Sequence, residues 1–114
     1  MMLYELLDMT EAKTIIVCNK PYDVTFCLLQ IDDGDTANAN TLIYDEIESE
    51  DVTGIVVDND TMYVYIEKER MYVENGWNGL SDYEQDEIDF YDLEHNQASP
   101  EMGDLARSLG IYVL

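Results

Sequence analysis

The residues of this chain that could do chemistry are almost all carboxylates. Asp and Glu number 26 against five Lys and Arg, and the single histidine, His95, has no serine or cysteine motif beside it. General acid and base catalysis needs a carboxyl group whose pKa differs from that of its neighbours, and no pattern singles one out here. The sequence also has no phosphate-binding glycine loop. We therefore expect no enzymatic activity and no cofactor.

Two short acidic turns have the composition of calcium-binding segments. They are Asp58-Asn59-Asp60 and Asp32-Asp33-Gly34-Asp35, and carboxylate oxygens are ligands that calcium prefers. A calcium loop of the EF-hand kind has about twelve residues and ends in a bidentate Glu, a pattern that neither turn shows. We therefore expect no metal site.

The net charge of −21 indicates the kind of partner. Solubility of a small domain needs a net charge of only about 2–8, and a larger excess destabilises the fold by self-repulsion. Such a surface repels nucleic acid and anionic membranes, so basic proteins are the expected partners. No apolar run is long enough to cross a membrane, and the first residues lack the pattern of a signal peptide. We therefore expect a cytoplasmic protein.

The aromatic content indicates that this charge lies on a folded body. The chain is 46% hydrophobic and has nine Tyr, two Phe and one Trp, whereas disordered acidic chains are poor in aromatic residues. A length of 114 residues predicts one domain over residues 1–114, burying roughly 60–70% of the surface of the unfolded chain. Cys18 and Cys27 fall on expected neighbouring strands. We expect buried, reduced thiols, although a cross-strand disulfide is geometrically possible.

The first half of the chain predicts one short helix and an antiparallel sheet. Leu3, Leu6 and Leu7 have helical spacing within residues 3–9. Segments rich in β-branched and aromatic residues, separated by turns, then predict strands. They are Thr14–Cys18, Asp23–Ile31, Thr41–Ile47 and a hairpin of Val52–Val57 with Thr61–Ile66 around residues 58–60. The expected fold class is α+β, with an antiparallel meander of four to five strands.

The second half predicts one or two helices. Residues 68–75 could continue the strand or begin a helix. The S-x-x-E pattern from Ser81 to Glu84 is a capping box, which predicts a helix start at Ser81. A second short helix is expected at Met102–Leu109, where Gly110 ends it, and the last four residues could dock against the sheet.

The helix expected from Ser81 has carboxylates along one face. Asp82, Asp86 and Asp89 fall at positions i, i+4 and i+7, and Asp92 follows about one turn later. No Lys or Arg lies between Met71 and Ala106, where there are ten acidic residues: Glu74, Asp82, Glu84, Asp86, Glu87, Asp89, Asp92, Glu94, Glu101 and Asp104. Helical turns repeat about every 5.4 Å, and phosphates along one DNA strand about every 3.4 Å. This row of carboxylates along the helix, with the acidic turns beside it, is therefore expected to imitate DNA. We expect it to bind a DNA-binding protein, and this binding should weaken as salt rises.

One segment also resembles a known family. Asn75-Gly76-Trp77-Asn78, followed by Tyr83-Glu84, Asp86-Glu87 and Phe90-Tyr91, is similar to the C-terminal part of a small phage-encoded type II-A anti-CRISPR protein. The resemblance implies a compact α+β protein that occupies the site where an RNA-guided nuclease reads the PAM duplex with arginines. This chain differs by extra residues between Asn78 and Tyr83, by one more residue in the helix, and by the segment after Glu94.

The resemblance also implies which acids meet the nuclease. Asp86 and Glu87 match the acidic pair that contacts the PAM-reading arginines, Asp33 matches an acidic turn position, and Asp23 is a looser match. The predicted partner-binding residues are therefore Asp86, Glu87, Asp82, Asp89, Asp33 and Asp23. Two alternatives stay open at this point: an immunity-type protein that neutralises a basic toxin, and an acidic structural protein of a phage or bacterium.

Overall fold

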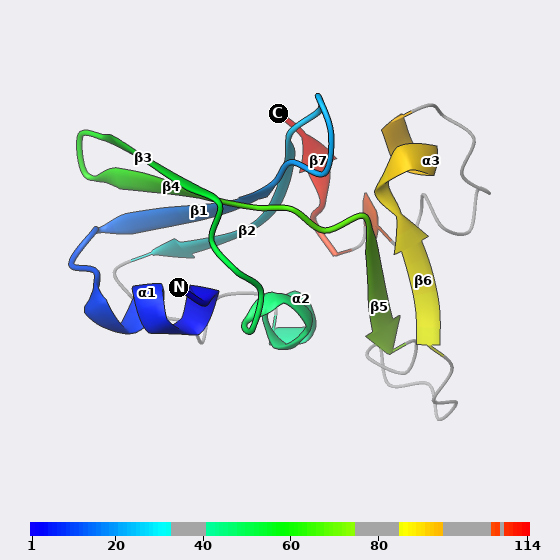
Figure 1. Ribbon diagram of the computed structural model, residues 1–114, viewed down its shortest axis with the longest axis horizontal. Helices are drawn as coiled ribbons and strands as arrows, with labels where there is room; N and C mark the ends of the chain where they lie inside the picture. The colour runs from blue at the N-terminus through cyan, green and yellow to red at the C-terminus, as the bar shows by residue number, and fades with distance from the viewer. Residues whose placement is uncertain (33–40, 75–84, 95–105, 108) are drawn as a thin grey trace.

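A computed structural model describes residues 1–32, 41–74, 85–94, 106, 107 and 109–114. Its elements, in chain order, are α1 (Leu3–Met9), β1 (Thr14–Asn19), β2 (Phe26–Asp32), α2 (Thr41–Ile47), β3 (Gly54–Asp58), β4 (Thr61–Ile66), β5 (Arg70–Glu74), β6 (Gln85–Asp89), α3 (Phe90–Glu94) and β7 (Tyr112–Val113) (Figure 1). This mixed content confirms the predicted α+β class, and α1 has the predicted bounds.

The described strands form two sheets. Five of them make one sheet in the order β3-β4-β1-β2-β7, while β5 and β6 form a separate antiparallel pair. The predicted antiparallel pairing holds between β3 and β4, β1 and β2, and β2 and β7. The pair β1 and β4 is parallel, which the predicted meander did not include. Parallel neighbours need a long connection between them, and here the chain passes through β2, α2 and β3 before it returns as β4.

The expected strand at Thr41–Ile47 was wrong, because this segment is the helix α2. Its β-branched residues suggested a strand. Ile43 and Ile47, however, lie four residues apart, on one side of a helix, and both are fully buried. A helix buries the two isoleucines together, whereas a strand would have spaced them farther apart along the chain direction. Packing against the sheet therefore decides the conformation of α2.

Two other local predictions were confirmed. β3 and β4 form the expected hairpin, in which Asp58 pairs with Thr61 and Asn59 takes a left-handed φ of 56°. Asparagine adopts this conformation more readily than most residues. The C-terminal residues dock against the sheet as β7, and Leu114 donates a backbone hydrogen bond to the Thr25 carbonyl at 2.9 Å. For residues 68–75 the sequence left a strand and a helix as alternatives, and the structure shows the strand β5 within this segment.

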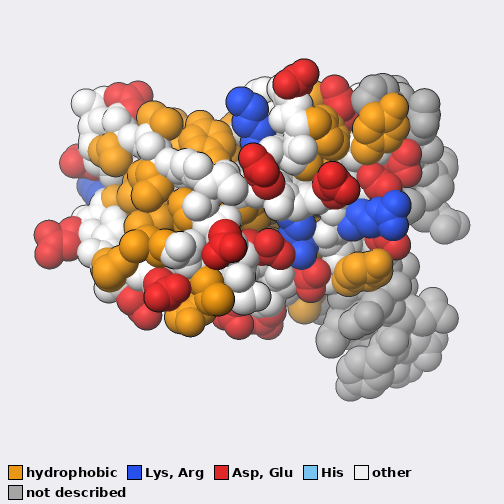
Figure 2. Space-filling model, in the orientation of Figure 1, with side chains coloured by type: hydrophobic (Ala, Val, Ile, Leu, Met, Phe, Trp, Pro, Cys, Tyr) orange, Lys and Arg blue, Asp and Glu red, His pale blue; other side chains and the backbone are white. Residues whose placement is uncertain are grey.

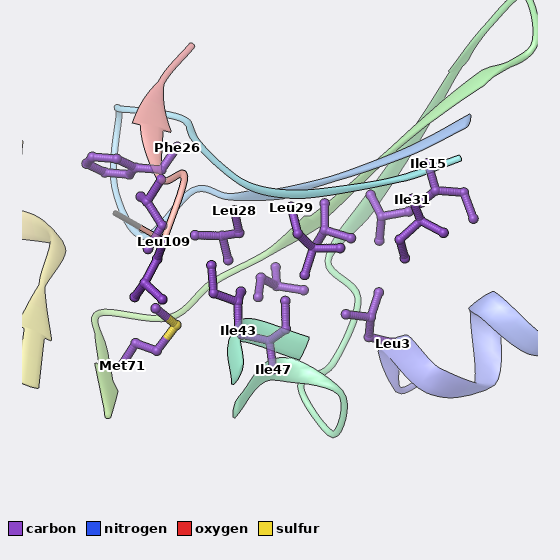
Figure 3. Packing of buried hydrophobic residues seen from close by; sticks show 14 of the residues in the cluster. Leu3, Ile15, Phe26, Leu28, Leu29, Ile31, Ile43, Ile47, Met71 and Leu109 are labelled. Carbon is purple, nitrogen blue, oxygen red and sulfur yellow. The ribbon is translucent and has the colours of Figure 1, made fainter. Parts of the chain in front are cut away.

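The hydrophobic core lies between the large sheet and the helices α1 and α2. Figure 3 shows Leu3 of α1 and Ile43 and Ile47 of α2 below side chains that point down from the sheet. In β4 the buried residues alternate with partly exposed ones, as expected for a strand covered on one face. Cys18 and Cys27 are opposite one another on β1 and β2, and both are buried free thiols, as predicted.

A buried amide fixes the chain as it leaves the large sheet. Asn19, at the end of β1, is the one polar residue among the buried side chains of the described chain. Its side-chain Nδ2 donates to the carbonyl of Lys68 at 2.8 Å, and its Oδ1 accepts from the Lys68 N–H, also at 2.8 Å. Because Lys68 lies between β4 and β5, these two bonds position the start of the β5–β6 hairpin.

Candidate acidic binding surface

The predicted acidic helix was wrong for residues 85–89 and right for residues 90–94. Residues 85–89 form the strand β6, paired with β5, and the helix α3 begins only at Phe90. Ser81, Glu84 and Asp82 lie outside the described residues. In a strand the side-chain direction alternates with a period of two, so the helical spacing i, i+4 and i+7 no longer places the acids in one row.

Burial explains why residues 85–89 form a strand. Ile88 is fully buried, and it pairs with Met71 of β5, which is also fully buried. Val73 of β5 is buried on the same face. This period of two brings the apolar side chains of both strands onto the core, and the capping-box pattern before them is a weaker local signal.

The opposite face of β6 brings two predicted site residues together around a basic residue. Glu87 and Asp89 are two residues apart on β6, and Arg70 lies across from Asp89 on β5. Arg70 Nε is 3.2 Å from Glu87 Oε1 and 3.7 Å from Asp89 Oδ2. Arg70 is 61% exposed, so each pair contributes at most about 1 kcal/mol. The acidic face therefore already holds one guanidinium, from within the chain.

A tyrosine joins the loop after β1 to this face. The Tyr22 ring contacts the Tyr91 ring edge-to-face, with a centroid separation of 6.0 Å. Its hydroxyl is buried without a hydrogen-bond partner. Burial, followed in order by the carboxylates of Glu94, Asp89 and Asp92, raises the pKa of Tyr22 to about 12. The charges of these acids therefore act together on the Tyr22 hydroxyl, between the loop and α3.

A hollow opens at the same place. Its volume is about 320 Å³, and it is lined by Tyr22, Glu69, Arg70, Asp89 and Tyr91. We define the β6–α3 acidic surface as the five carboxylates of Glu69, Glu87, Asp89, Asp92 and Glu94. With the one positive charge of Arg70, these five negative charges give a formal charge of −4.

The other predicted site residues are distributed differently. Asp23 is exposed and follows Tyr22, so it lies on the loop that contacts α3. Asp86 lies on β6 opposite Val73. Asp33, like Asp82, lies outside the described residues. The structure thus brings Glu87 and Asp89 together and adds Glu69, Asp92, Glu94 and Arg70 to them.

Sequence reasoning missed Arg70 and Tyr22, which lie beside these carboxylates. Arg70 is the last basic residue before the long acidic stretch, and its position opposite Asp89 depends on the β5–β6 register. The role of Tyr22 depends on a contact between residues 69 positions apart in the chain. The only available signal was the strand alternative for residues 68–75, which would have suggested a cross-strand partner for Arg70.

A second group of carboxylates surrounds α2. Burial raises the pKa of Tyr44, and Glu48, Asp8 and Asp45 add to this effect in that order. On the same helix and in the turn after it, Glu46 and Glu50 bind Lys68, whose Nζ lies 3.6 Å and 2.9 Å from their carboxylates. Figure 2 shows acidic side chains over much of the visible face, with a few basic side chains between them. The charge is therefore spread over the body and is not confined to one row.

This arrangement is suited to binding cationic side chains. Carboxylates that flank a guanidinium make charge-assisted hydrogen bonds, and the aromatic rings of Tyr22 and Tyr91 can add stacking surface. Within the described ranges, no group of three or more Asp, Glu, His or Cys residues could hold a metal ion. None of the helices described is long and apolar enough to cross a membrane. Comparisons with protein-family models, curated proteins and solved structures give no match.

Proposed function

We propose that this protein is an acidic DNA-mimic inhibitor that binds the nucleic-acid site of a basic DNA-binding protein. The observation that carries the proposal is a net charge of −21 on a folded body with a packed core. Such a charge opposes folding, so a binding role provides a reason for it. In this proposal the protein acts in the cytoplasm of a host cell.

The specific target we propose is the PAM-duplex site of a type II CRISPR effector, a phage-defence nuclease. Support comes from the resemblance of the NGWN segment and of the acidic-aromatic residues after it. The β6–α3 acidic surface supplies groups of the right chemistry, because arginines that bind bases or phosphates also bind carboxylates. Residues 85–89 form a strand, so the proposed binding surface is no longer a row of acids along a helix. A cluster of acids around Arg70 and Tyr22 replaces a regular row of charges.

This change also favours a second candidate. An immunity-type protein that plugs the active site of one basic toxin needs acids but no regular charge spacing. The two acidic surfaces, on β6–α3 and around α2, satisfy that requirement. Duplex DNA separates the candidates: it should displace the inhibitor from a DNA-binding site and should leave a toxin that does not bind DNA in its complex.

The experiment measures inhibition of DNA cleavage by the CRISPR effector and binding competition by a PAM-containing duplex. Asp92→Lys with Glu94→Lys changes two residues at the end of α3 and raises the net charge by four. Asp58→Lys with Asp60→Lys is the matched control, because it makes the same change at the exposed β3–β4 turn.

We expect the α3 variant to weaken binding by roughly tenfold or more, as two charge pairs at a partly desolvated interface contribute about 1–3 kcal/mol. The turn variant should change binding much less. Equal losses in the two variants would show that total charge, and not this surface, governs binding. Wild-type protein that neither inhibits the nuclease nor competes with duplex DNA would rule out the proposed target. The pair predicted from the sequence, Asp86→Lys with Glu87→Lys, is less clean because it places a lysine beside Arg70.

A further inference from the structure

The edge strand β3 exposes an apolar surface that the acidic surfaces do not explain. β3 lies at one end of the five-stranded sheet, and β4 is its only partner among the described strands. Ile55, Val56 and Val57 are 47%, 52% and 66% exposed. Open edges present unpaired peptide groups, which natural proteins ordinarily protect with charges, proline, bulges or a covering segment.

The middle of β3 has no such protection. From Val52 to Val57 the chain has neither a charged residue nor a proline. In a protein with 26 acidic residues, this is a place where a second copy could approach with the least charge repulsion. Figure 2 shows hydrophobic side chains gathered on the side of the molecule where β3 and β4 lie in Figure 1.

A hollow lies beside the same edge. Its volume is about 390 Å³, and its lining is mixed. It is formed by the apolar side chains of Ala12, Val57 and Met62 and by Thr10, Glu11, Lys13, Asn59 and Asp60. Val57 pairs with Met62 across the hairpin, and Ile55 pairs with Val64. Because side chains alternate along a strand, Ile55 and Val57 lie on the same face of β3. The edge thus combines exposed apolar side chains with a hollow next to them.

We propose that β3 is the contact between two copies of this chain, which pair edge to edge in antiparallel fashion about a two-fold axis. When Val56 lies opposite Val56 of the second copy, Ile55 of each copy lies opposite Val57 of the other. Each Ile55 is then placed beside the hollow that Val57 lines. The two sheets become one continuous sheet, and the same residues supply both halves of the interface, as two-fold symmetry requires.

The charges of the flanking residues agree with this register. Asp58 lies opposite Gly54 of the second copy, and Asp60 lies opposite Val52. No carboxylate of the paired segments therefore lies directly opposite another, an arrangement that would be destabilising. A shift of the register by two residues in one direction would place Asp60 opposite Glu50, so the charges select against that alternative.

Salt should strengthen this contact. Each copy has a net charge of −21, so screening reduces the repulsion between two copies. Binding of the acidic surface to a basic partner should instead weaken as salt rises. The inference does not rest on the proposed function, and the opposite salt dependences keep the two distinguishable.

Sedimentation velocity and light scattering over a range of protein concentrations test the proposal, at about 0.1 to 1 M NaCl, where the screening length falls from about 10 to about 3 Å. We expect the mass to rise towards twice the monomer value of 13.1 kDa, and to do so at lower protein concentration in higher salt. Val56→Lys should weaken association by roughly fivefold, because two lysines would meet at the two-fold axis. Val113→Lys is the matched control, since Val113 is 55% exposed on the opposite edge strand, β7.

A cross-linking variant tests the register. Val56→Cys should form a disulfide-linked dimer on mild oxidation, and Val113→Cys should not. A monomeric mass for the wild-type protein at all concentrations and salt levels would overturn the proposal, whatever the variants do. Equal weakening by Val56→Lys and Val113→Lys, or equal cross-linking by the two cysteine variants, would overturn the assignment to β3.

Discussion

The amide of Asn19 is expected to be one of the most sensitive single positions for stability. Its two hydrogen bonds of 2.8 Å to the Lys68 peptide connect the end of β1 to the start of the β5–β6 hairpin. Asn19→Ala removes both bonds and leaves the N–H and the carbonyl of Lys68 without these partners. Asn19 itself is fully buried, so a cavity is left as well.

The expected loss is about 3 kcal/mol. Each hydrogen bond contributes about 0.5–1.5 kcal/mol, and a buried peptide group left without a partner costs about 1–3 kcal/mol. Because the Lys68 peptide is only partly buried, water can satisfy one of its two groups in the variant, which keeps the estimate near the low end of the summed range. The total stability of a domain of this size is about 5–15 kcal/mol, so a large share of it would be lost.

Urea denaturation followed by circular dichroism measures the effect. Asn19→Ala should lower the midpoint concentration without a change in slope. Gln30→Ala is the matched control, because Gln30 is exposed and its amide hydrogen bond to Asp32 is a surface contact. Gln30→Ala should change stability by about 0.5 kcal/mol or less.

Two further measurements identify the cause. Asn19→Asp keeps an acceptor for the Lys68 N–H but loses the donor to its carbonyl, so the free energy of unfolding should also fall. Amide hydrogen exchange at Lys68 should be slow in the wild-type protein and fast in Asn19→Ala. A loss below about 1 kcal/mol for Asn19→Ala, or a loss equal to that of Gln30→Ala, would refute the role assigned to this amide.

Three other predictions concern Tyr22, Cys18 and Gly110. Since the pKa of Tyr22 is raised to about 12 in the folded state, the stability linked to its protonated form should be present below pH 10 and lost as pH rises towards about 12; the difference between wild type and Tyr22→Phe in alkaline unfolding measures this. Burial, with a smaller effect from Cys27, raises the pKa of the Cys18 thiol to about 11, so thiol reagents at neutral pH should label the native protein slowly and the urea-unfolded protein fast. Gly110 has a φ of +85°, so Gly110→Ala should lower the free energy of unfolding by about 1 kcal/mol, whereas Gly110→Asn should lower it less.

Part of the fold could be predicted because local patterns and the core agree there. The helix at Leu3–Met9 and the hairpin around Asn59 have apolar spacing or turn residues that match their final environment. The segments 41–47 and 85–89 could not be predicted this way. In the first, two isoleucines four residues apart suggest a strand, but packing of both against the sheet makes the segment a helix. In the second, the acids suggest a solvated helix, but Ile88 is buried beside Met71 on the paired strand, and this packing makes the segment a strand.

The same distinction between local pattern and tertiary packing applies to the candidate binding surface. Composition alone sets the charge of this protein, because 26 acidic residues on a chain apolar enough to fold must lie largely on its surface. Tertiary structure decided where those charges lie and what they contact. Arg70 reaches Glu87 and Asp89 only through the pairing of β5 with β6. Tyr22 is influenced by the charges of Asp89, Asp92 and Glu94 only because its ring packs on Tyr91 of α3. The physical reason is that charge is a property of composition, while the distance between charges depends on strand register and on packing between segments far apart in the chain.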